Sequence, residues 1–324
     1  MSKPVLFVSF RPLERAENIK AIYDYYDGPK HYICTDDPDF YEAYTSDWYS
    51  VAVTDDFPAY KRNNTIMIWH GIQGGKKIGL DQQNTPYYKR EYADRMSYII
   101  SASTAMIPIW SQCTGVPKEQ ILPLGMPRTD EVILFRSFNE KTKERTYLFV
   151  PTFRDKGDTP FPDIDWAYID SLLNDNERII IKAHPWQDDR GGTDQVTNGI
   201  GNGMYQHIVV LSPSAATTPF LSISDVIITD YSSIMFDAYL MNKPVVLFEK
   251  TPGYTETRGM YLDYPGSYCS FLATDEKQLV DMLRFRYSHP WLTDRELSCR
   301  YITAGACDGH SCERLSNLIN QLKG

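Results

Sequence analysis

The segment from Ser224 to Lys243, SDVIITDYSSIMFDAYLMNK, constrains the fold more than any other part of this 324-residue chain. Its apolar run at 226–229 predicts a buried strand, and a polar turn then leads into a helix that begins near Ile234. The first turn of a helix has unpaired backbone N–H groups, and the hydroxyls of Ser232 and Ser233 add donors there. Such a turn suits a phosphate or pyrophosphate. The simpler alternative, which this segment alone favours, is that one of the serines caps the helix.

Strands alternate with helices on both sides of this segment, and glycine or polar residues follow most strands. In the first half, we expect strands at 4–9, 31–34, 48–53, 65–69, 98–101 and 120–124, with helices at 16–26 and 102–114. In the second half, we expect strands at 146–150, 178–182, 208–211, 226–229 and, as the last, 244–248, with helices at 166–174, 219–223, 276–287 and 311–322. Residues 308–311 are expected to cap the final helix. This alternation predicts parallel sheets with ligands at the carboxyl ends of their strands.

A polar, charged stretch at 137–145 divides the chain into two halves of ordinary domain size. We therefore expect an α/β protein with two Rossmann-like domains, residues 1–140 and 141–324, that face each other across a cleft, as in the GT-B type of glycosyltransferase. The C-terminal helix is left free to cross back to the first domain. Periplasmic binding proteins share the two-domain α/β pattern, but no signal peptide opens this sequence.

The composition of the chain argues against several classes of protein and of ligand. The net charge of −9 argues against a protein that wraps nucleic acid. No window approaches the roughly 18 apolar residues of a membrane-spanning helix. The six cysteines are scattered, and the pair Cys307 and Cys312 lacks zinc-site spacing. We therefore expect free thiols in a reducing cytoplasm, with no metal and no cofactor.

Two histidines follow apolar strands. His70 comes directly before Gly71, where a substrate can approach, and its ordinary pKa suits a general base. His184 occupies the matching place in the second half, before Pro185, and it could donate to a diphosphate or protonate a leaving phosphate. The alternative for each is a loop histidine held by backbone hydrogen bonds.

Charged and hydroxyl side chains follow other strands. In GMPRTD, Arg128 could clamp a phosphate, or it could pair with Asp130 or a neighbouring acid to hold the loop. In PTFRD, Thr152 and Arg154 offer the same choice. Arg258 is a similar phosphate candidate. We expect the two lysines of the glycine-rich loop after His70 to be solvated or to contact an acceptor phosphate, rather than to act in catalysis.

Eight segments occur in a fixed order along the chain: WHG at 69, GMPRTD at 125, PTFRD at 151, KAHP at 182, SDVIITDYSSIMFD at 224, NKPVVLF at 242, RGMYLDY at 258 and DGHSCERL at 308. This series resembles the CDP-glycerol glycerophosphotransferase family, the teichoic acid primases and polymerases, over about residues 65–315. The resemblance implies a two-Rossmann transferase that moves a polyol phosphate from a CDP-polyol to an acceptor hydroxyl and releases CMP.

The resemblance also implies catalytic and binding roles for particular residues. It implies catalytic functions for two histidines: His70 as the base on the acceptor side and His184 as a diphosphate contact on the donor side. We assign donor binding to Thr152, Arg154, Asp230, Ser232, Ser233, Asp237 and Arg258. We assign acceptor binding to Gly71, Lys76, Lys77, Arg128 and Asp130. The expected partners are CDP-glycerol or another CDP-polyol and a glycan or polyprenol-linked acceptor.

The expected setting is teichoic-acid-like or capsular polymer synthesis in the cytoplasm, with weak peripheral contact at the inner face of the membrane left open. Three alternatives stay open. The donor could be CDP-ribitol, the enzyme could be a nucleotide-sugar glycosyltransferase of the same fold, or the chain could be a catalytically silent nucleotide-binding assembly protein. Both histidines and the full DYSS block argue against the silent alternative.

Overall fold

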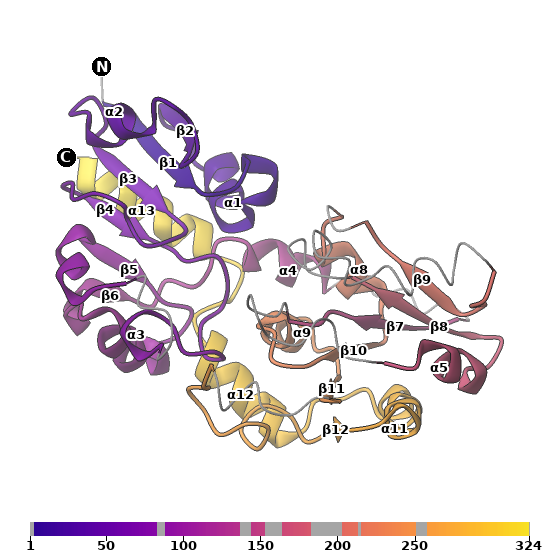
Figure 1. The fold of residues 1–324 in the computed structure, drawn as a ribbon. Coiled ribbons are helices and arrows are strands. Elements are labelled where there is room, and N and C mark those ends of the chain that lie inside the picture. Colours follow the sequence, from indigo (N-terminus) through magenta and orange to yellow (C-terminus); the bar gives the residue numbers. More distant parts are fainter. Residues whose placement is uncertain are drawn as a thin grey trace. The chain divides into compact units, whose positions relative to one another are not determined.

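The computed structural model describes residues 3–82, 88–136, 144–152, 164–182, 203–212, 215–250 and 258–323. These residues form two units (Figure 1). Unit 1 contains the chain up to Leu134, residues 258–261, and the chain from Arg300 onward. Unit 2 contains the described residues from Phe135 to Lys250 and Leu262–Cys299. The end of the chain therefore packs with its beginning.

Unit 1 is built on a parallel six-stranded sheet whose order is β2-β1-β3-β4-β5-β6. Its strands are β1 (Val5–Ser9), β2 (Lys30–Cys34), β3 (Val51–Thr54), β4 (Thr65–Met67), β5 (Tyr98–Ile100) and β6 (Ile121–Leu122). Every residue of β1, β3 and β4 is buried, as expected for parallel strands that are covered on both faces.

Helices cover both faces of this sheet. The helices are α1 (Glu17–Tyr25), α2 (Phe40–Thr45), α3 (Ile107–Thr114), α4 (Thr129–Phe135) and α13 (Ser311–Lys323), with short 3₁₀ segments at 13–15, 79–81, 90–95, 104–106 and 118–120. On one face, Phe7 of β1 packs with Ile19 of α1 and Leu315 of α13. On the other face, Leu6 packs with Phe40 and Tyr44 of α2. Neighbouring residues of β1 thus serve opposite faces, as the pleat of a strand requires.

Unit 2 repeats this plan with the strand order β12-β11-β10-β7-β8-β9, again all parallel. The strands are β7 (Arg145–Phe149), β8 (Glu177–Ile181), β9 (Ile208–Val210), β10 (Val226–Thr229), β11 (Val245–Phe248) and β12 (Leu272–Ala273). The helices are α5 (Trp166–Leu172), α8 (Thr218–Ile223), α9 (Ile234–Leu240) and α11 (Glu276–Ser288), and α12 (Asp294–Ala304) carries the chain back to unit 1. Phe149, Trp166, Ile228 and Leu283 belong to its core.

The α/β class and the two parallel sheets are confirmed. Several details are wrong. The sequence did not predict the two-residue β12, which follows the strand at 244–248 and completes the sheet. The strand expected at 65–69 stops at Met67, and Trp69 takes a left-handed backbone conformation with φ 54°. The sequence pattern did not reveal α2, α4 or α12. Within the described residues, no helix is both long and apolar enough to span a membrane.

Candidate functional site

The first candidate site lies where β1, β3 and β4 end in unit 1. Asn18 of α1, which is buried, links two loops at this edge. Its Nδ2 donates to the Trp69 carbonyl at 3.1 Å, and its Oδ1 accepts from the Arg128 backbone N–H at 3.0 Å. Together with the left-handed turn at Trp69, these bonds fix the direction in which the chain presents His70.

The His70 imidazole is partly exposed and lies against the rings of Phe10 and Trp69. Its Nδ1 is 3.4 Å from the Asp55 carbonyl oxygen. Because a carbonyl oxygen only accepts, Nδ1 carries the proton and Nε2 keeps its lone pair. Burial is the main cause that lowers the pKa of His70 to about 3, and the positive charges of Arg11, Lys76 and Arg128 add to the effect. His70 is therefore neutral near pH 7, with Nε2 able to accept a proton.

Asp55 supports this arrangement from the end of β3. The residue is 1% exposed, and its Oδ2 accepts a hydrogen bond from the Ser9 hydroxyl at 2.9 Å. Burial raises the pKa of Asp55 to about 6. Sequence reasoning assigned no role to Ser9, Arg11, Asn18 and Asp55. The available signal was their position directly after strands or at the first helix, the same signal that identified His70.

The glycine-rich loop after His70 is completed by a segment far along the chain. Lys76 forms an antiparallel bridge with Met260, and the Lys77 N–H donates to the Gly259 carbonyl at 3.0 Å. Arg258 donates from Nε to the Lys77 carbonyl at 3.2 Å. The structure therefore brings Arg258, predicted to bind the donor, together with the predicted acceptor residues Lys76 and Lys77. Its donor role stays a prediction.

Tyr261 anchors this segment. Its hydroxyl accepts from the Ile78 N–H at 3.2 Å and donates to Oδ2 of Asp81 at 3.1 Å. Gln112 of α3 donates to the other oxygen of Asp81, also at 3.1 Å. Gly71 is buried at the start of the loop, whereas Lys76 and Lys77 are partly exposed. The loop is thus held at both ends while its two lysines reach solvent.

The GMPRTD motif divides into two roles. Arg128 is buried, and its Nη1 lies 3.5 Å from a carboxylate oxygen of Glu17, so among the described residues its acidic partner is Glu17 rather than Asp130. The two carboxylate oxygens of Asp130 accept from the N–H groups of Ser311 and Cys312 at 2.9 and 2.8 Å. The expectation that 308–311 supplies the cap of the last helix is therefore wrong, because Asp130 supplies it. The acceptor role of Asp130 stays a prediction.

The second candidate site lies in unit 2, at the turn after β10. Asp230 is buried, and its Oδ1 accepts from the N–H groups of Thr152 and Tyr231, both at 2.7 Å. Because Thr152 follows β7, this carboxylate ties together the turns after two neighbouring strands. The carboxyl end of β8, which leads toward the KAHP motif, lies on the other side of β7. His184 and Arg154 lie outside the described residues.

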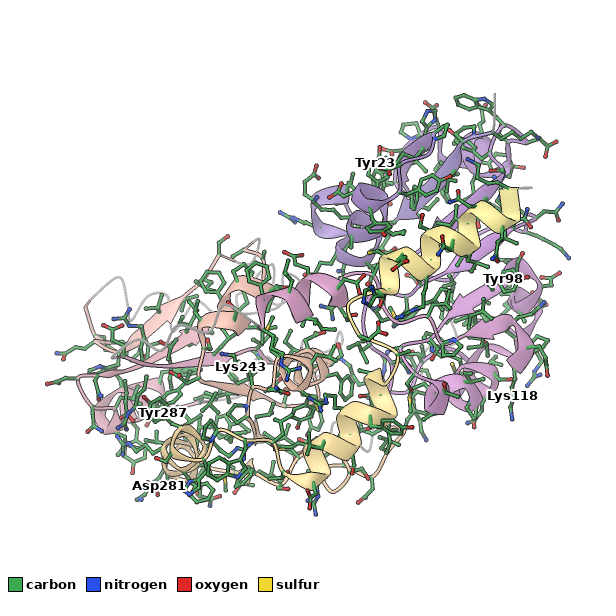
Figure 2. All side chains as sticks on the ribbon, turned by 180° about the vertical axis from the view of Figure 1, so that it is seen from behind. Tyr23, Tyr98, Lys118, Lys243, Asp281 and Tyr287 are labelled. Atoms are coloured by element: carbon green, nitrogen blue, oxygen red, sulfur yellow. The ribbon has the colours of Figure 1, made fainter. Side chains whose placement is uncertain are left out.

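The serines of DYSS differ from each other. The Ser232 Oγ accepts from the Ile234 N–H at 3.4 Å, a long hydrogen bond, whereas Ser233 makes no side-chain cap bond to α9. Both serines are partly exposed. Asp237 is fully buried, as are the other residues of α9. Lys243, labelled in Figure 2, is also buried and donates from Nζ to the Ser222 carbonyl at 2.7 Å, which ties the end of α9 to α8.

Metal-ligating side chains do not gather in the parts of the chain that the structure describes: no group of three or more His, Cys, Asp or Glu residues there could hold a metal ion.

Two parallel sheets, each with polar groups gathered at the carboxyl ends of its strands, define a two-domain α/β protein of the doubly wound class. Residues 43–321 match the sequence model of the CDP-Glycerol:Poly(glycerophosphate) glycerophosphotransferase family. The chain belongs to this family.

Three curated relatives illustrate the range of the family. The teichoic acid ribitol-phosphate primase of Bacillus spizizenii is 26% identical over 292 residues, which cover 82% of this chain and 72% of the primase. The teichoic acid poly(ribitol-phosphate) polymerase of the same organism is 28% identical over 251 residues, which cover 69% of this chain and 38% of the polymerase. The teichoic acid glycerol-phosphate primase of Bacillus subtilis is 23% identical, with 81% and 69% covered. The chain thus spans less than half of the polymerase's length.

Solved structures show the same fold at lower identity. The wall teichoic acid polymerase TagF superposes with a TM-score of 0.76 at 20% identity, over 99% of this chain and 89% of that chain. A TagF variant soaked with CDPG gives 0.74, also at 20% identity, with 99% and 88% covered. The Staphylococcus aureus MnaA–UDP structure gives 0.56 at 14% identity, with 98% and 96% covered. These structures support the architecture of the chain.

Proposed function

We propose that this protein transfers glycerol phosphate from CDP-glycerol to an acceptor hydroxyl and releases CMP, in the synthesis of a teichoic-acid-like or capsular polymer. The observation that carries the proposal is the His70 geometry in a chain of this family. The Asp55 carbonyl holds the Nδ1 proton, so the neutral ring offers Nε2 to an incoming hydroxyl. The positive charges of Arg11, Lys76 and Arg128 act on this base.

The chemistry follows from these positions. As the acceptor oxygen forms its bond to the β-phosphorus, Nε2 of His70 takes the hydroxyl proton. The bond between the β-phosphorus and the bridging oxygen breaks, and the electron pair leaves with CMP. Phosphoryl transfer depends mostly on positioning and electrostatics. An anionic substrate beside His70 would raise the pKa of the imidazole toward 7, because a nearby negative charge favours the imidazolium. Substrate binding would thus strengthen the base.

We place the acceptor in unit 1 and the donor in unit 2, in a GT-B arrangement. For the donor, the buried Asp230 carboxylate orders the turns that carry Thr152 and the two serines. We infer that Ser232, Ser233 and Thr152, with Arg154, His184, Asp237 and Arg258 as predicted from the sequence, serve the diphosphate end of the CDP-polyol. Gly71, Lys76, Lys77 and Arg128 serve the acceptor, for which we propose a glycan or a polyprenol-linked glycan.

A second donor is favoured by one observation: relatives named for ribitol phosphate match as well as those named for glycerol phosphate. CDP-ribitol is therefore the alternative donor. We further propose a cytoplasmic setting, with weak contact at the inner membrane face. All six cysteines are free thiols, which supports a reducing compartment.

The decisive assay incubates the purified protein with CDP-glycerol, CDP-ribitol or a UDP-sugar, each with a lipid-linked or soluble glycan acceptor. We expect CMP release from a CDP-polyol that depends on the acceptor. Turnover of the UDP-sugar alone would show a glycosyltransferase instead. Binding of CDP-polyols without turnover by any acceptor would show the silent assembly protein.

A variant tests the base within the same assay. His70→Ala should lower kcat about 10²–10⁴-fold, because proton acceptance contributes about that much to such reactions. The matched control is His310→Ala, since His310 is exposed and pairs only with Glu313 among the described residues. An unchanged rate in His70→Ala would remove the base from the mechanism.

A further inference from the structure

Arg11, Lys76 and Arg128 act electrostatically on His70, and two of them come from loops on either side of it in the strand order. In that order, β1 and β6 each lie two strands from β4, the strand that leads to His70. Arg11 follows β1, and Arg128 follows β6. Neighbouring strands lie about 4.8 Å apart, so the two loops start about 10 Å to either side of the base. Lys76 belongs to the loop after His70 itself. The loops that carry Arg11, Lys76 and Arg128, here called the row, are therefore spread along this edge of the sheet.

Arg11 is the member of this row that sequence reasoning did not assign. Its N–H donates to the Ser9 hydroxyl at 3.1 Å, and Ser9 in turn donates to Asp55. Its guanidinium lies over the Phe10 ring, 4.7 Å from the centroid. The same ring contacts His70, with 6.0 Å between ring centroids. Arg11 and His70 thus share one aromatic neighbour and one hydrogen-bonded chain through Ser9 and Asp55.

The acidic residues near this row have other partners and form no ion pair with Arg11. Glu17 lies 3.5 Å from Arg128. Asp55 accepts from Ser9, and the backbone N–H of Phe57 donates to Asp56 at 2.7 Å. Arg11 acts on both aspartates at longer range and makes no ion pair of its own with any described residue. Its partly exposed guanidinium is thus available to a ligand.

We propose that Arg11, at one end of this row, binds a phosphate carried by the acceptor, one unit away from the hydroxyl that attacks. The inference rests on the proposed function, because it takes the attacking hydroxyl to lie at Nε2 of His70. A transferred phosphoryl group is compact, whereas the row extends to both sides of the base. An extended anionic acceptor, already bearing a polyol phosphate, fits that distribution of charge better than a neutral glycan. Guanidinium groups suit such phosphates because they can bind two oxygens at once.

The test compares two acceptors that end in the same free hydroxyl, one with a phosphodiester next to it and one without. In Arg11→Gln, we expect the KM for the phosphate-bearing acceptor to rise about tenfold to a hundredfold, the range for a lost charge-assisted hydrogen bond. The KM for the CDP-polyol and the KM for the uncharged acceptor should not rise. Arg15→Gln is the matched control, since Arg15 is exposed at the end of the neighbouring 3₁₀ segment.

Three results would overturn the proposal. An equal loss with both acceptors would place the Arg11 charge on the transferred phosphoryl group. A higher KM for the CDP-polyol would place it on the donor. Unchanged kinetics would remove it from binding altogether. Arg11→Lys keeps the charge and should recover part of the lost affinity, which separates recognition from misfolding.

A binding experiment on the full chain, with no donor present, decides the question separately from turnover. The probe is a glycerol phosphate trimer, with glycerol as its uncharged match, followed by calorimetry and by NMR titration of the His70 ring. The trimer should raise the pKa of His70, and Arg11→Gln should weaken trimer binding about tenfold. If no CDP-polyol yields CMP but the trimer still binds through Arg11, the proposed function fails and the anion site stands. If CMP is released and Arg11→Gln binds the trimer normally, only the anion site fails.

Discussion

Asp130 holds the first turn of α13 by accepting the backbone N–H of Ser311 at 2.9 Å, although the two residues are 181 positions apart. The other carboxylate oxygen accepts the N–H of Cys312 at 2.8 Å. A negative charge at a helix N-terminus satisfies unpaired donors and interacts favourably with the helix dipole. A motif residue that looks like a ligand-binding acid therefore joins the GMPRTD loop to the last helix of unit 1.

Removing this carboxylate should cost stability. We expect Asp130→Ala to lower the free energy of unfolding by about 1–2 kcal/mol, the usual effect of losing a helix cap. Urea unfolding followed by circular dichroism measures it. Glu313→Gln on the same helix is the control, because Glu313 is exposed and its described partner is the exposed His310. Unchanged unfolding combined with a higher acceptor KM would show that Asp130 binds substrate instead.

We expect the hydroxyl of Tyr261 to contribute to stability and to hold the glycine-rich loop closed. In Tyr261→Phe, Asp81 loses one hydrogen-bond donor and the Ile78 N–H loses its acceptor, which we expect to cost about 1–3 kcal/mol of unfolding free energy. The glycine-rich loop should also open more often, because its pairing with 259–261 depends on this anchor. Hydrogen exchange of the Lys77 and Ile78 amides measures the opening.

The control for this variant is Tyr60→Phe, since Tyr60 is 40% exposed and contacts Phe40, Tyr41 and Tyr44 through its ring. Equal protection of the loop amides in wild type and Tyr261→Phe would show that the backbone pairing holds without the hydroxyl.

The central strands could be predicted because the sequence of a buried parallel strand is a short apolar run bounded by turn residues. VLFVS, TIM and VIIT, at β1, β4 and β10, are such runs. The two-residue β12 was not predicted, although β6, which is equally short, was found within the longer expected segment at 120–124. The helix of FYEAYT at α2 was missed because six residues rich in aromatics carry no clear helical periodicity.

Contacts between distant segments limited the prediction of the site. The residue types at the ends of strands pointed to His70, but the contacts that orient it come from Asn18 and from the Asp55 carbonyl. A backbone carbonyl has no sequence signature, and an asparagine in a helix looks like a surface residue. The pairing of 258–261 with the glycine-rich loop likewise depends on the tertiary fold, so Arg258 was assigned from its motif alone.

The buried Asp55 predicts a distinct pH dependence of stability. Its pKa is about 6 in the folded chain and about 3.8 when unperturbed. Between these values the folded state binds more protons than the unfolded state, so the contribution of Asp55 to stability falls as pH rises from about 4 to 6. Above pH 6 the full cost of burying the charge is present, on the order of 1–3 kcal/mol. Asp55→Asn should therefore gain stability relative to wild type as pH rises through this window.

His70 contributes with the opposite sign. Its folded pKa of about 3 lies below the ordinary 6.5, so its contribution to stability rises with pH across that interval. The measurement must therefore compare Asp55→Asn with wild type at each pH, which cancels the His70 contribution. A stability difference that stays constant from pH 4 to 7 would show that Asp55 titrates normally.

The two serines of DYSS should separate helix capping from donor binding. Ser232 accepts the Ile234 N–H, so Ser232→Ala should lower the unfolding free energy by about 0.5–1 kcal/mol. Ser233 makes no cap bond to α9, so Ser233→Ala should leave unfolding unchanged. If its hydroxyl donates to the donor diphosphate, the Kd for CDP-glycerol should rise about tenfold, the value of one hydrogen bond to a charged group. Calorimetric titration of both variants gives the answer. Normal CDP-glycerol binding in Ser233→Ala would remove this hydroxyl from the diphosphate site, and normal binding in both variants would remove both serine hydroxyls from it.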